Sequence, residues 1–535
     1  MWRSRSASQS RIDSCLEFPR ASGPVPWLSR SPRRPPCRSP RTPPSARSSS
    51  TTPTIVCDIA DDGFIAPLYT PLLRYEAKPV ANAPEGVKVT TEDTTKIVGY
   101  LAESYKVSDD GKELTFKLRD GLKFPSGNPL DAAAVKASLE FTLKSGTCGT
   151  YFFEAAQFGN TEAIEAPDAT TLVIKLKRGE PLLPHALTQP NTGIIDIKAV
   201  EANGGKAWLA GHAAGSGPYL LADYQPGVRA VFKANPDFFG EAPREKDVIV
   251  NFITDNATLL LQARNKQADV TLGLSKASVE SLKGADGLKI IEVPTARWQL
   301  IGLPNQTAPF DNAKFREAFS YALPYEAILK NAAHGYGELF YGPYPPQFPA
   351  FKAELGAPRA YDLEKAKALL AESGVKTPVK AEIIIREGQN DQEQIATIAQ
   401  GAWSQIGVNL TIRKLPASGY QEAVGAKTKT AAIVRFDGPS VDDPAWLLDY
   451  DMRCASLYNT SNYCSKEAEA LLDTRHDLKT DAERQALWDK IAKIWLADSP
   501  RIPVYADVYT AVVSDGVKDW HFAQDGPFDL NLWGR

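Results

Sequence analysis

The side chains that most often perform catalysis or bind metal ions are few and widely spaced in this sequence. Its five histidines include no pair with the i, i+4 spacing that places two ligands on one helix face. They are His185, His212, His334, His476 and His521. Gly215-Ser216-Gly217-Pro218 differs from the G-x-S-x-G nucleophile elbow, and its proline would block the helix that follows such a serine. Walker loops and dinucleotide fingerprints are also missing. We therefore expect no catalytic centre, no metal site and no cofactor.

Two of the six cysteines are placed to form a disulfide. Cys454 and Cys464 flank a polar loop that has no nearby histidine and no C-x-x-C motif. We predict that they are bonded, which implies an oxidising compartment. A bridge of this loop size stabilises a fold by about 2–3 kcal/mol on a chain-entropy estimate. Two reduced thiols are the alternative, and Cys148 has no evident partner.

The elements that must position these residues alternate between strands and helices. Residues 114–118 and 172–176 alternate apolar and polar side chains, which is typical of half-buried strands. Apolar stripes with helical spacing predict helices over 362–373 and 391–406. The sequence therefore predicts a mixed α/β protein.

Two further helices carry start signals. Asp311 can cap a helix whose apolar residues recur at i, i+3, i+4 and i+7. Thr480 and Glu483 form a capping box at the start of another helix, and Pro500 marks its end. We interpret the apolar residues of both helices as core.

The N-terminal segment differs in composition from the rest of the chain. Residues 1–50 contain 10 Arg, 13 Ser and 9 Pro but no Lys, and too few large apolar side chains to offset the entropy of ordering. We expect residues 1–53 to be disordered. They are either a targeting leader, as the Arg-rich and Ser-rich composition indicates, or the product of a wrongly placed start, which we favour. The apolar stretch 25–28 is too short for the core of a secretory signal.

Charge and hydropathy exclude two classes of protein. The formal net charge is −3 for the chain and +8 for residues 1–50, which leaves −11 for residues 51–535. An acidic body without a basic stripe argues against a nucleic-acid binder. No stretch approaches the ~20 apolar residues of a membrane-spanning helix. The 535 residues suffice for about three domain-sized units.

Several longer motifs follow one another in a recognisable order. They are Leu101–Tyr105 with Asp110–Phe124, Gly215–Tyr219, Asn235–Gly240, Phe310–Ala322, Tyr361–Leu370 and Ile502–Tyr505. Together they resemble the peptide/nickel-type (family 5) periplasmic solute-binding proteins of ABC importers, in particular the dipeptide- and oligopeptide-binding proteins. The resemblance covers roughly residues 54–535.

The resemblance implies a two-lobed α/β fold, the type II periplasmic-binding-protein fold with an extra subdomain in lobe I. Lobe I would comprise residues 54–296, with the extra subdomain at about 79–167, and a return over 504–535. Lobe II would comprise residues 297–503. The two strands that cross between the lobes would form a hinge, which permits domain closure.

The function that the resemblance implies is binding without turnover. The protein would be a periplasmic, monomeric receptor that holds a peptide or peptide-like solute between its lobes and delivers it to an inner-membrane ABC permease. Two alternatives remain open: an extracytoplasmic α/β enzyme, and a sensor or chaperone that uses the same fold. A receptor returns its ligand unchanged, whereas an enzyme does not.

The family also suggests which acid anchors the ligand. In peptide-binding relatives an Asp four residues before a Pro pairs with the α-amino group of the ligand. Here that position is Ser440, four residues before Pro444. Asp437 takes the role if the loop has gained residues, and Asp442 is otherwise the nearest acid. Asp443 is as well suited to cap a helix that has Pro at its first position.

A second departure from the family concerns the carboxylate of the ligand. Dipeptide binders carry an Arg about nine residues before the Trp of a W-x-x-I-G-V motif, and here Gln394 stands before Trp403. Arg386 or Arg435 could substitute. Longer peptides, opine-like conjugates and other zwitterionic or cationic solutes therefore remain open. Nickel or haem is a weaker alternative because the histidines do not cluster.

Aromatic residues complete the candidate site. Tyr69 matches an early family segment that lines the cleft, and Trp298 lies on the first crossing strand. Both could stack on a ligand or pack within a lobe. Trp446 follows Asp443, and Tyr458 lies inside the predicted disulfide loop, where it could form a lid.

Overall fold

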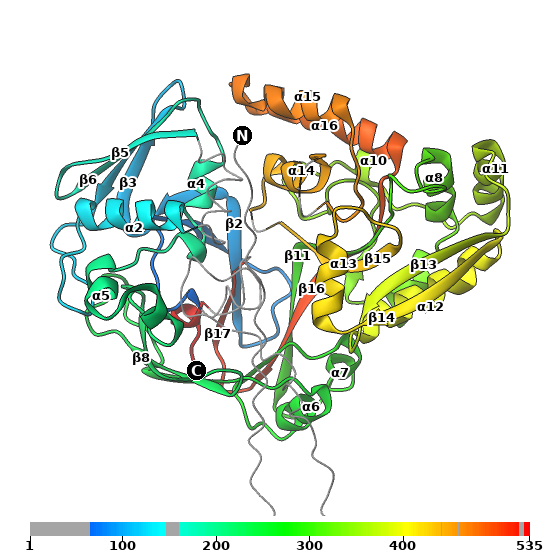
Figure 1. Ribbon diagram of the computed structural model, residues 1–535. Coiled ribbons are helices and arrows are strands. Elements are labelled where there is room, and N and C mark those ends of the chain that lie inside the picture. Colours follow the sequence, from blue (N-terminus) through cyan, green and yellow to red (C-terminus); the bar gives the residue numbers. More distant parts are fainter. Residues whose placement is uncertain (1–64, 146–159, 440, 455, 457–458, 524–528) are drawn as a thin grey trace, which may run out of the picture. The chain divides into compact units, whose positions relative to one another are not determined.

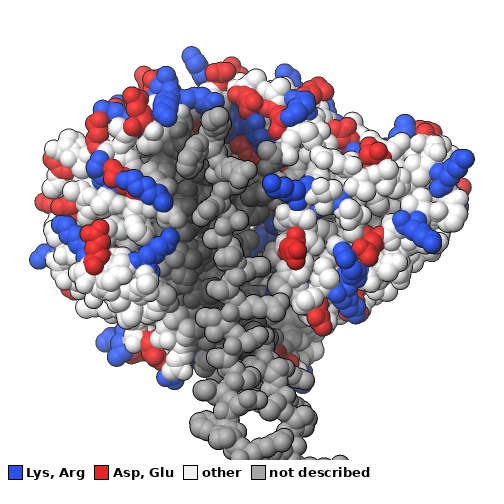
Figure 2. All heavy atoms as spheres, viewed as in Figure 1, with Lys and Arg blue, Asp and Glu red and all other residues white. Residues whose placement is uncertain are grey.

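The computed structural model describes residues 65–145, 160–439, 441–454, 456, 459–523 and 529–535 (Figure 1). The predictions for residues 1–53, Cys148, Ser440 and Tyr458 lie outside the described residues. The described chain is a mixed α/β protein with four sheets. None of its helices combines the length and the apolar character that a membrane span needs. Basic and acidic side chains are interspersed on the described part of the face in Figure 2.

A four-stranded antiparallel sheet in the order β3-β4-β6-β5 lies in the first half of the chain. Its strands are β3 (Ala102–Val107), β4 (Glu113–Leu118), β5 (Thr161–Asp168) and β6 (Thr171–Leu176). β4 and β6 confirm the two strands predicted from alternation. Their inward residues pack with helix α2 (Ala132–Lys144), which begins at Asp131, whose side chain accepts a hydrogen bond from the Ala134 backbone N–H. This sheet has a hydrophobic core of its own.

Two smaller sheets accompany it. One contains β7 (Tyr219–Gln225), β8 (Arg229–Ala234) and β9 (Asp247–Asn251). The other joins distant parts of the chain, because β17 (Asp519–Phe522) runs parallel to β2 (Lys88–Gly99), which in turn pairs with β1 (Leu73–Pro79).

The largest sheet is organised around two long antiparallel strands, β11 (Leu288–Gly302) and β16 (Arg501–Ser514). On one side they pair with β10 (Val270–Leu272) and β12 (Gly337–Glu338). On the other follow β15 (Ala432–Asp437), β13 (Val379–Arg386) and β14 (Val408–Leu415). The register of β11 on β16 shifts between Pro294 and Trp298 and again between Gln299 and Leu300. These irregularities fall where the sequence predicts that the chain crosses between lobes.

Helices cover this sheet and, together with its strands and loops, contribute to the largest core cluster. The predicted stripes form α11 (Leu363–Ser373) and α12 (Asn390–Ser404). The capping box of Thr480 and Glu483 is present at the start of α16 (Asp481–Asp498). The prediction that Asp311 caps α8 (Ala313–Tyr321) is wrong by one residue, because the Asn312 side chain accepts the hydrogen bond from the Phe315 backbone N–H.

The remaining helices are short. They are α4 (Leu183–Ala186), α5 (Ile197–Ala202), α6 (Asn256–Arg264), α7 (Lys276–Glu280), α9 (Tyr325–Asn331), α10 (Ala353–Gly356), α13 (Ala417–Gly425), α14 (Pro444–Met452) and α15 (Lys466–Asp473). The 3-10 turns are η2 (Pro190–Thr192), η3 (Gly205–Ala210), η4 (Thr474–Asp477) and η5 (Leu530–Leu532).

The predicted disulfide between Cys454 and Cys464 is confirmed. It closes the loop between α14 and α15. Within this loop the Ser461 carbonyl accepts a hydrogen bond from the Asn305 backbone N–H at 2.8 Å. The disulfide therefore closes a loop that is packed against the end of β11.

Candidate functional site

Asp437 ends β15, which pairs with β11. In the antiparallel register it stands opposite Trp298 of β11, so both side chains lie on one face of the sheet. The carboxylate is 5% exposed, lies 3.3 Å from Arg435 Nε and accepts a hydrogen bond from the Gly438 backbone N–H at 3.0 Å. Its Oδ2 accepts no hydrogen bond from the described residues. A buried carboxylate oxygen without a hydrogen bond is a candidate for a donor on a ligand.

A second buried pair lies next to this carboxylate. Asp451 of α14 and Arg501 of β16 form an ion pair, with side chains 4% and 5% exposed. Burial raises the pKa of Asp451 to about 6, against the lowering effect of Arg501 and with a further increase from the negative charge of Asp437. The Arg501 guanidinium lies 5.4 Å from the ring centroid of Trp298. The end of β15 thus adjoins a cluster of two Asp and two Arg side chains.

Next to this cluster, the chain after β15 passes close to Arg297 of β11. A Cβ atom added at Gly438 would lie 2.6 Å from Cγ of Arg297. Only glycine therefore lets the chain after β15 pass Arg297 at this distance. The Arg297 guanidinium also lies 5.8 Å from the ring centroid of Phe522 in β17. This contact links β11 to the sheet of β1, β2 and β17.

The segment before α14 contains the other candidate acids. Asp443 is the N-cap: its Oδ1 accepts a hydrogen bond from the Ala445 backbone N–H at 2.7 Å, and Pro444 occupies the first turn. The capping role suggested by the sequence is thus present. Asp442 is 5% exposed, and Trp446 is 3% exposed within the largest core cluster. Burial, and then the negative charge of Asp443, raise the pKa of Tyr344.

Opposite α14 stands a buried pair that sequence reasoning did not identify. Glu180, just before α4, places Oε2 3.6 Å from Nδ1 of His476 in η4, and these side chains are 1% and 2% exposed. Burial raises the pKa of Glu180 to about 7 despite the nearby Arg475. Burial, with help from Arg475 and Arg178, lowers the pKa of His476 to about 4. Burial therefore shifts both groups in the direction of their neutral forms.

The predicted aromatic residues do not form one group. Tyr69 is 1% exposed in a core with β7 and β8, and its hydroxyl oxygen accepts a hydrogen bond from the Ala214 backbone N–H at 3.1 Å. Trp298 is 1% exposed in a different core, where it meets Phe340 edge to face. The structure brings Trp298 together with Asp437, whereas Tyr69 packs elsewhere.

The two substitutes for the missing carboxylate clamp differ in their surroundings. Gln394 is exposed on α12, so the clamp position of the family faces solvent here. Arg435 is paired with Asp437, next to the candidate anchor. Arg386 ends β13, and its backbone N–H donates to Gln392 Oε1 at 2.9 Å. Of the two arginines, Arg435 is thus the one that lies at the buried cluster.

Four buried ionisable residues were not predicted as site residues. They are Glu180, Asp451, His476 and Arg501. Arg501 directly precedes the motif Ile502–Tyr505, and a charged residue at the start of an apolar strand was a usable signal. The other three have no local pattern, because their partners are distant in sequence.

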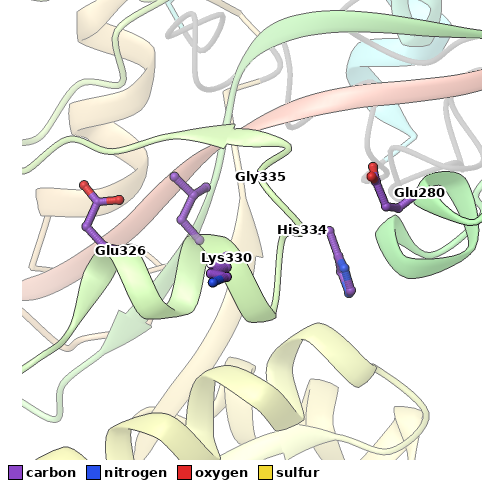
Figure 3. Close-up of a pocket in the computed structure, with 6 residues that line it drawn as sticks. Glu280, Glu326, Lys330, His334 and Gly335 are labelled. Atoms are coloured by element: carbon purple, nitrogen blue, oxygen red, sulfur yellow. The ribbon is translucent and has the colours of Figure 1, made fainter. Parts of the chain in front are cut away.

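An open pocket of roughly 600 Å³, solvent-filled space included, lies elsewhere, and Figure 3 shows its charged residues around it. It is lined by Glu280, Glu326, Leu329, Lys330, His334 and Gly335. Glu280 comes from α7 and accepts a hydrogen bond from the Tyr336 hydroxyl at 2.9 Å, while Glu326 and Lys330 come from α9. The charged side chains are exposed, and none of the predicted site residues lines this pocket. It is not suited to desolvate a solute.

The chain is similar to known solute-binding proteins. Residues 96–458 match the family model described as bacterial extracellular solute-binding proteins, family 5 Middle. The chain is 28% identical over 478 residues to DdpA of Escherichia coli (strain K12), a probable D,D-dipeptide-binding periplasmic protein, with 88% of this chain and 89% of the relative covered. It is 26% identical over 444 residues to the glutathione-binding protein GsiB of Shigella flexneri serotype 5b (strain 8401), covering 81% and 85%.

A solved structure shares the fold. The periplasmic binding protein DppA of Helicobacter pylori, in complex with the peptide STSA, superposes with a TM-score of 0.77 at 22% identity. The match covers 90% of this chain and 94% of that chain. The fold is thus the two-lobed α/β fold of type II periplasmic binding proteins, as expected from the sequence motifs.

Proposed function

Because the chain belongs to the bacterial extracellular solute-binding proteins of family 5, we propose that it is a receptor that binds a peptide or peptide-like solute and delivers it to an ABC permease. We place lobe I at residues 54–296 and 504–535, with the extra subdomain at about 79–167, and lobe II at 297–503. The observation that carries the proposal is the buried Asp437 carboxylate, which ends a strand beside the crossing strands and keeps one oxygen without a hydrogen bond.

Asp437 is the proposed anchor for the ammonium group of the solute. Asp443 already uses a carboxylate oxygen to cap α14, which would compete with a ligand. Asp437 Oδ2 accepts no hydrogen bond from the described residues, although it lies 3.3 Å from Arg435 Nε in an ion pair. A ligand ammonium would supply the missing hydrogen bond and a charge-assisted contact. Asp442, Ser440 and Tyr458 stay predicted lining residues, and the last two lie outside the described residues.

The charge balance of the cluster favours a zwitterionic solute. Asp437 and Asp451 face Arg435 and Arg501, so the buried group is balanced before a ligand enters. A net charge added to such a site would stay uncompensated, whereas a zwitterion adds none. Arg435 is the proposed partner of the solute carboxylate. Peptides and opine-like conjugates both satisfy this requirement.

The buried aromatics support the shape of the site instead of stacking on the solute. Trp298 is buried with its ring centroid 5.4 Å from the Arg501 guanidinium, and Trp446 belongs to the same core. Tyr69 packs against Gly193 and Gly215, where an added Cβ would lie 2.6 and 2.5 Å from its side chain. We therefore assign these three residues to lobe packing.

The relatives DdpA and GsiB are named as binding proteins, not as enzymes. We propose that this chain likewise returns its solute unchanged. A periplasmic location is supported by the disulfide, which is stable in an oxidising compartment. We expect a monomer that meets its permease in the membrane.

Calorimetric titration with four probes tests the anchor. The probes are trialanine, N-acetyl-trialanine, alanyl-phenylalanine and octopine. We expect a probe with a free ammonium group to bind, and N-acetylation or Asp437→Asn to weaken binding by at least 100-fold, since each removes one half of the charged contact. Asp223→Asn is the matched control, because Asp223 is an exposed acid of lobe I. Equal affinity of Asp437→Asn and the wild type would reject the anchor.

A further inference from the structure

Helix α4 of lobe I has two apolar faces that belong to two different cores. Leu183 and Leu187 are members of the core of the four-stranded sheet. Leu182 and Ala186 are instead members of the large cluster built mainly from lobe II. Residues 182 and 186, like 183 and 187, are one helical turn apart, which places each pair on its own side of the turn. The helix is therefore inserted between the two cores.

Lobe I holds α4 from one side through polar contacts as well. The Leu187 carbonyl accepts a hydrogen bond from the Leu73 backbone N–H at 3.1 Å, at the start of β1. The His185 Nδ1 lies 2.8 Å from the Tyr75 hydroxyl in the same strand. These bonds fix α4 to lobe I, so its other face is the one that can separate.

The free face carries a polar contact next to its apolar one. Glu180 Oε1 accepts a hydrogen bond from the Leu182 backbone N–H at 3.1 Å, which fixes the carboxyl beside the apolar contact. Its Oε2 faces His476 of lobe II at 3.6 Å. His476 is positioned by η4, where the neighbouring Arg475 is fixed to Asp449 at 2.7 Å. Figure 1 shows α4 at the edge of its lobe, toward α14 and α15.

We propose that Glu180 and the Leu182–Ala186 face of α4 form a clasp that holds lobe II against lobe I, and that opening of this clasp limits solute release. The proposal rests on the receptor function proposed above and adds the structural step that controls it. The clasp joins Glu180 to His476 of η4, and it joins Leu182 and Ala186 to the large cluster built mainly from lobe II.

The make-up of the contact suits repeated opening. Leu182 supplies apolar area, which separates without leaving a bare charge. Burial favours the neutral form of both Glu180 and His476, so the contact that separates contains no strong ion pair. A contact of this kind can be strong enough to hold the lobes and still reversible.

Hydrogen–deuterium exchange on the full chain without added solute tests the contact itself. Leu182→Ala truncates the face toward lobe II, and Leu187→Ala removes the same atoms from the face toward lobe I. These leucines are 2% and 0% exposed, so they are closely matched. We expect Leu182→Ala to accelerate exchange at least tenfold in residues 472–478, and Leu187→Ala to leave that lobe II segment unchanged. If Leu182→Ala does not fold, Leu182→Val replaces it.

The same variants give a functional readout with trialanine as the probe. We expect Leu182→Ala to raise the dissociation rate about tenfold while Leu187→Ala leaves it unchanged. Equal exchange in residues 472–478 of wild type and Leu182→Ala, or equal acceleration in both variants, overturns the clasp. If the exchange result holds but trialanine and the other probes do not bind, the receptor proposal fails and the contact stands.

Discussion

The molecule contains two buried groups of ionisable side chains that are neutralised in different ways. Within the proposed lobe II, Asp451 and Arg501 are an ion pair, and Asp437 is paired with Arg435. Between the proposed lobes, Glu180 Oε2 lies 3.6 Å from His476 Nδ1, and burial shifts the pKa of each group in the direction that favours its neutral form. The first group stays together throughout the working cycle in our account, whereas the second is made and broken.

This difference has a physical reason. An ion pair inside a lobe gains attraction from its low-dielectric surroundings, but removal of one partner leaves a buried charge that is very costly. A contact that must open repeatedly is better built from neutral groups, because each partner regains water without the loss of a strong ion pair. The buried ionisable groups inside lobe II are therefore ion pairs, whereas burial favours the neutral forms of the groups between the lobes.

The largest expected effect comes from breaking the pair inside lobe II. Arg501→Met leaves Asp451 buried without its partner and should lower the free energy of unfolding by about 3–5 kcal/mol at neutral pH. Urea denaturation measures this change. Arg229→Met, at an exposed ion pair of lobe I, is the control and should change stability by about 0–1 kcal/mol. Similar values for both variants would remove the distinction between buried and exposed pairs.

Removal of the Cys454–Cys464 disulfide should have the next largest effect on stability. Replacement of Cys454 and Cys464 by serine opens a loop with a sequence separation of 10 and should cost about 2–3 kcal/mol. Thermal unfolding of the full chain measures the loss. Equal thermal stability of the double variant and the wild type would contradict this contribution of the disulfide.

Glu180 and His476 should each make the free energy of unfolding depend on pH. The Glu180 pKa rises from 4.5 to about 7, so its contribution to stability is present below pH 4.5 and is lost as pH rises toward 7. The His476 pKa falls from 6.5 to about 4, so its contribution is present above pH 6.5 and is lost as pH falls toward 4. In the wild type these opposite slopes nearly cancel.

Single variants should expose each slope. In His476→Asn only Glu180 titrates, and stability should fall by about 1–3 kcal/mol from pH 4.5 to 7, relative to wild type. In Glu180→Gln only His476 titrates, and stability should rise by a similar amount from pH 4 to 6.5. The other charges that act on these groups, chiefly Arg475, Arg178, Asp449, Asp443 and Asp473, are the same in both variants. Slopes of the same sign in the two variants would contradict the account.

The sequence predicted local features better than contacts between distant residues. The capping box of Thr480 and Glu483 needs only a four-residue pattern, and the structure has it. Asp311 and Asn312 are both good caps, so the choice between them depended on backbone geometry that no pattern reports. The family motifs predicted the two-lobed fold because they are long and ordered.

The buried pairs could not be predicted in this way. Asp451 and Arg501 are 50 residues apart, and Glu180 and His476 are farther apart still. Their pKa values depend on burial that only the folded chain creates. Tyr69 shows that a family motif can also mislead. It matches a family position that lines the cleft, but here its side chain is packed in a core.

Native mass spectrometry of the full chain, purified without denaturation, tests the central claim most directly. We predict a stoichiometric adduct that is released intact on unfolding and that carries both an ammonium and a carboxylate group. Asp437→Asn should be purified without the adduct, whereas Asp223→Asn should retain it. An empty wild-type protein that also gains no thermal stability from peptides or opines would contradict the account.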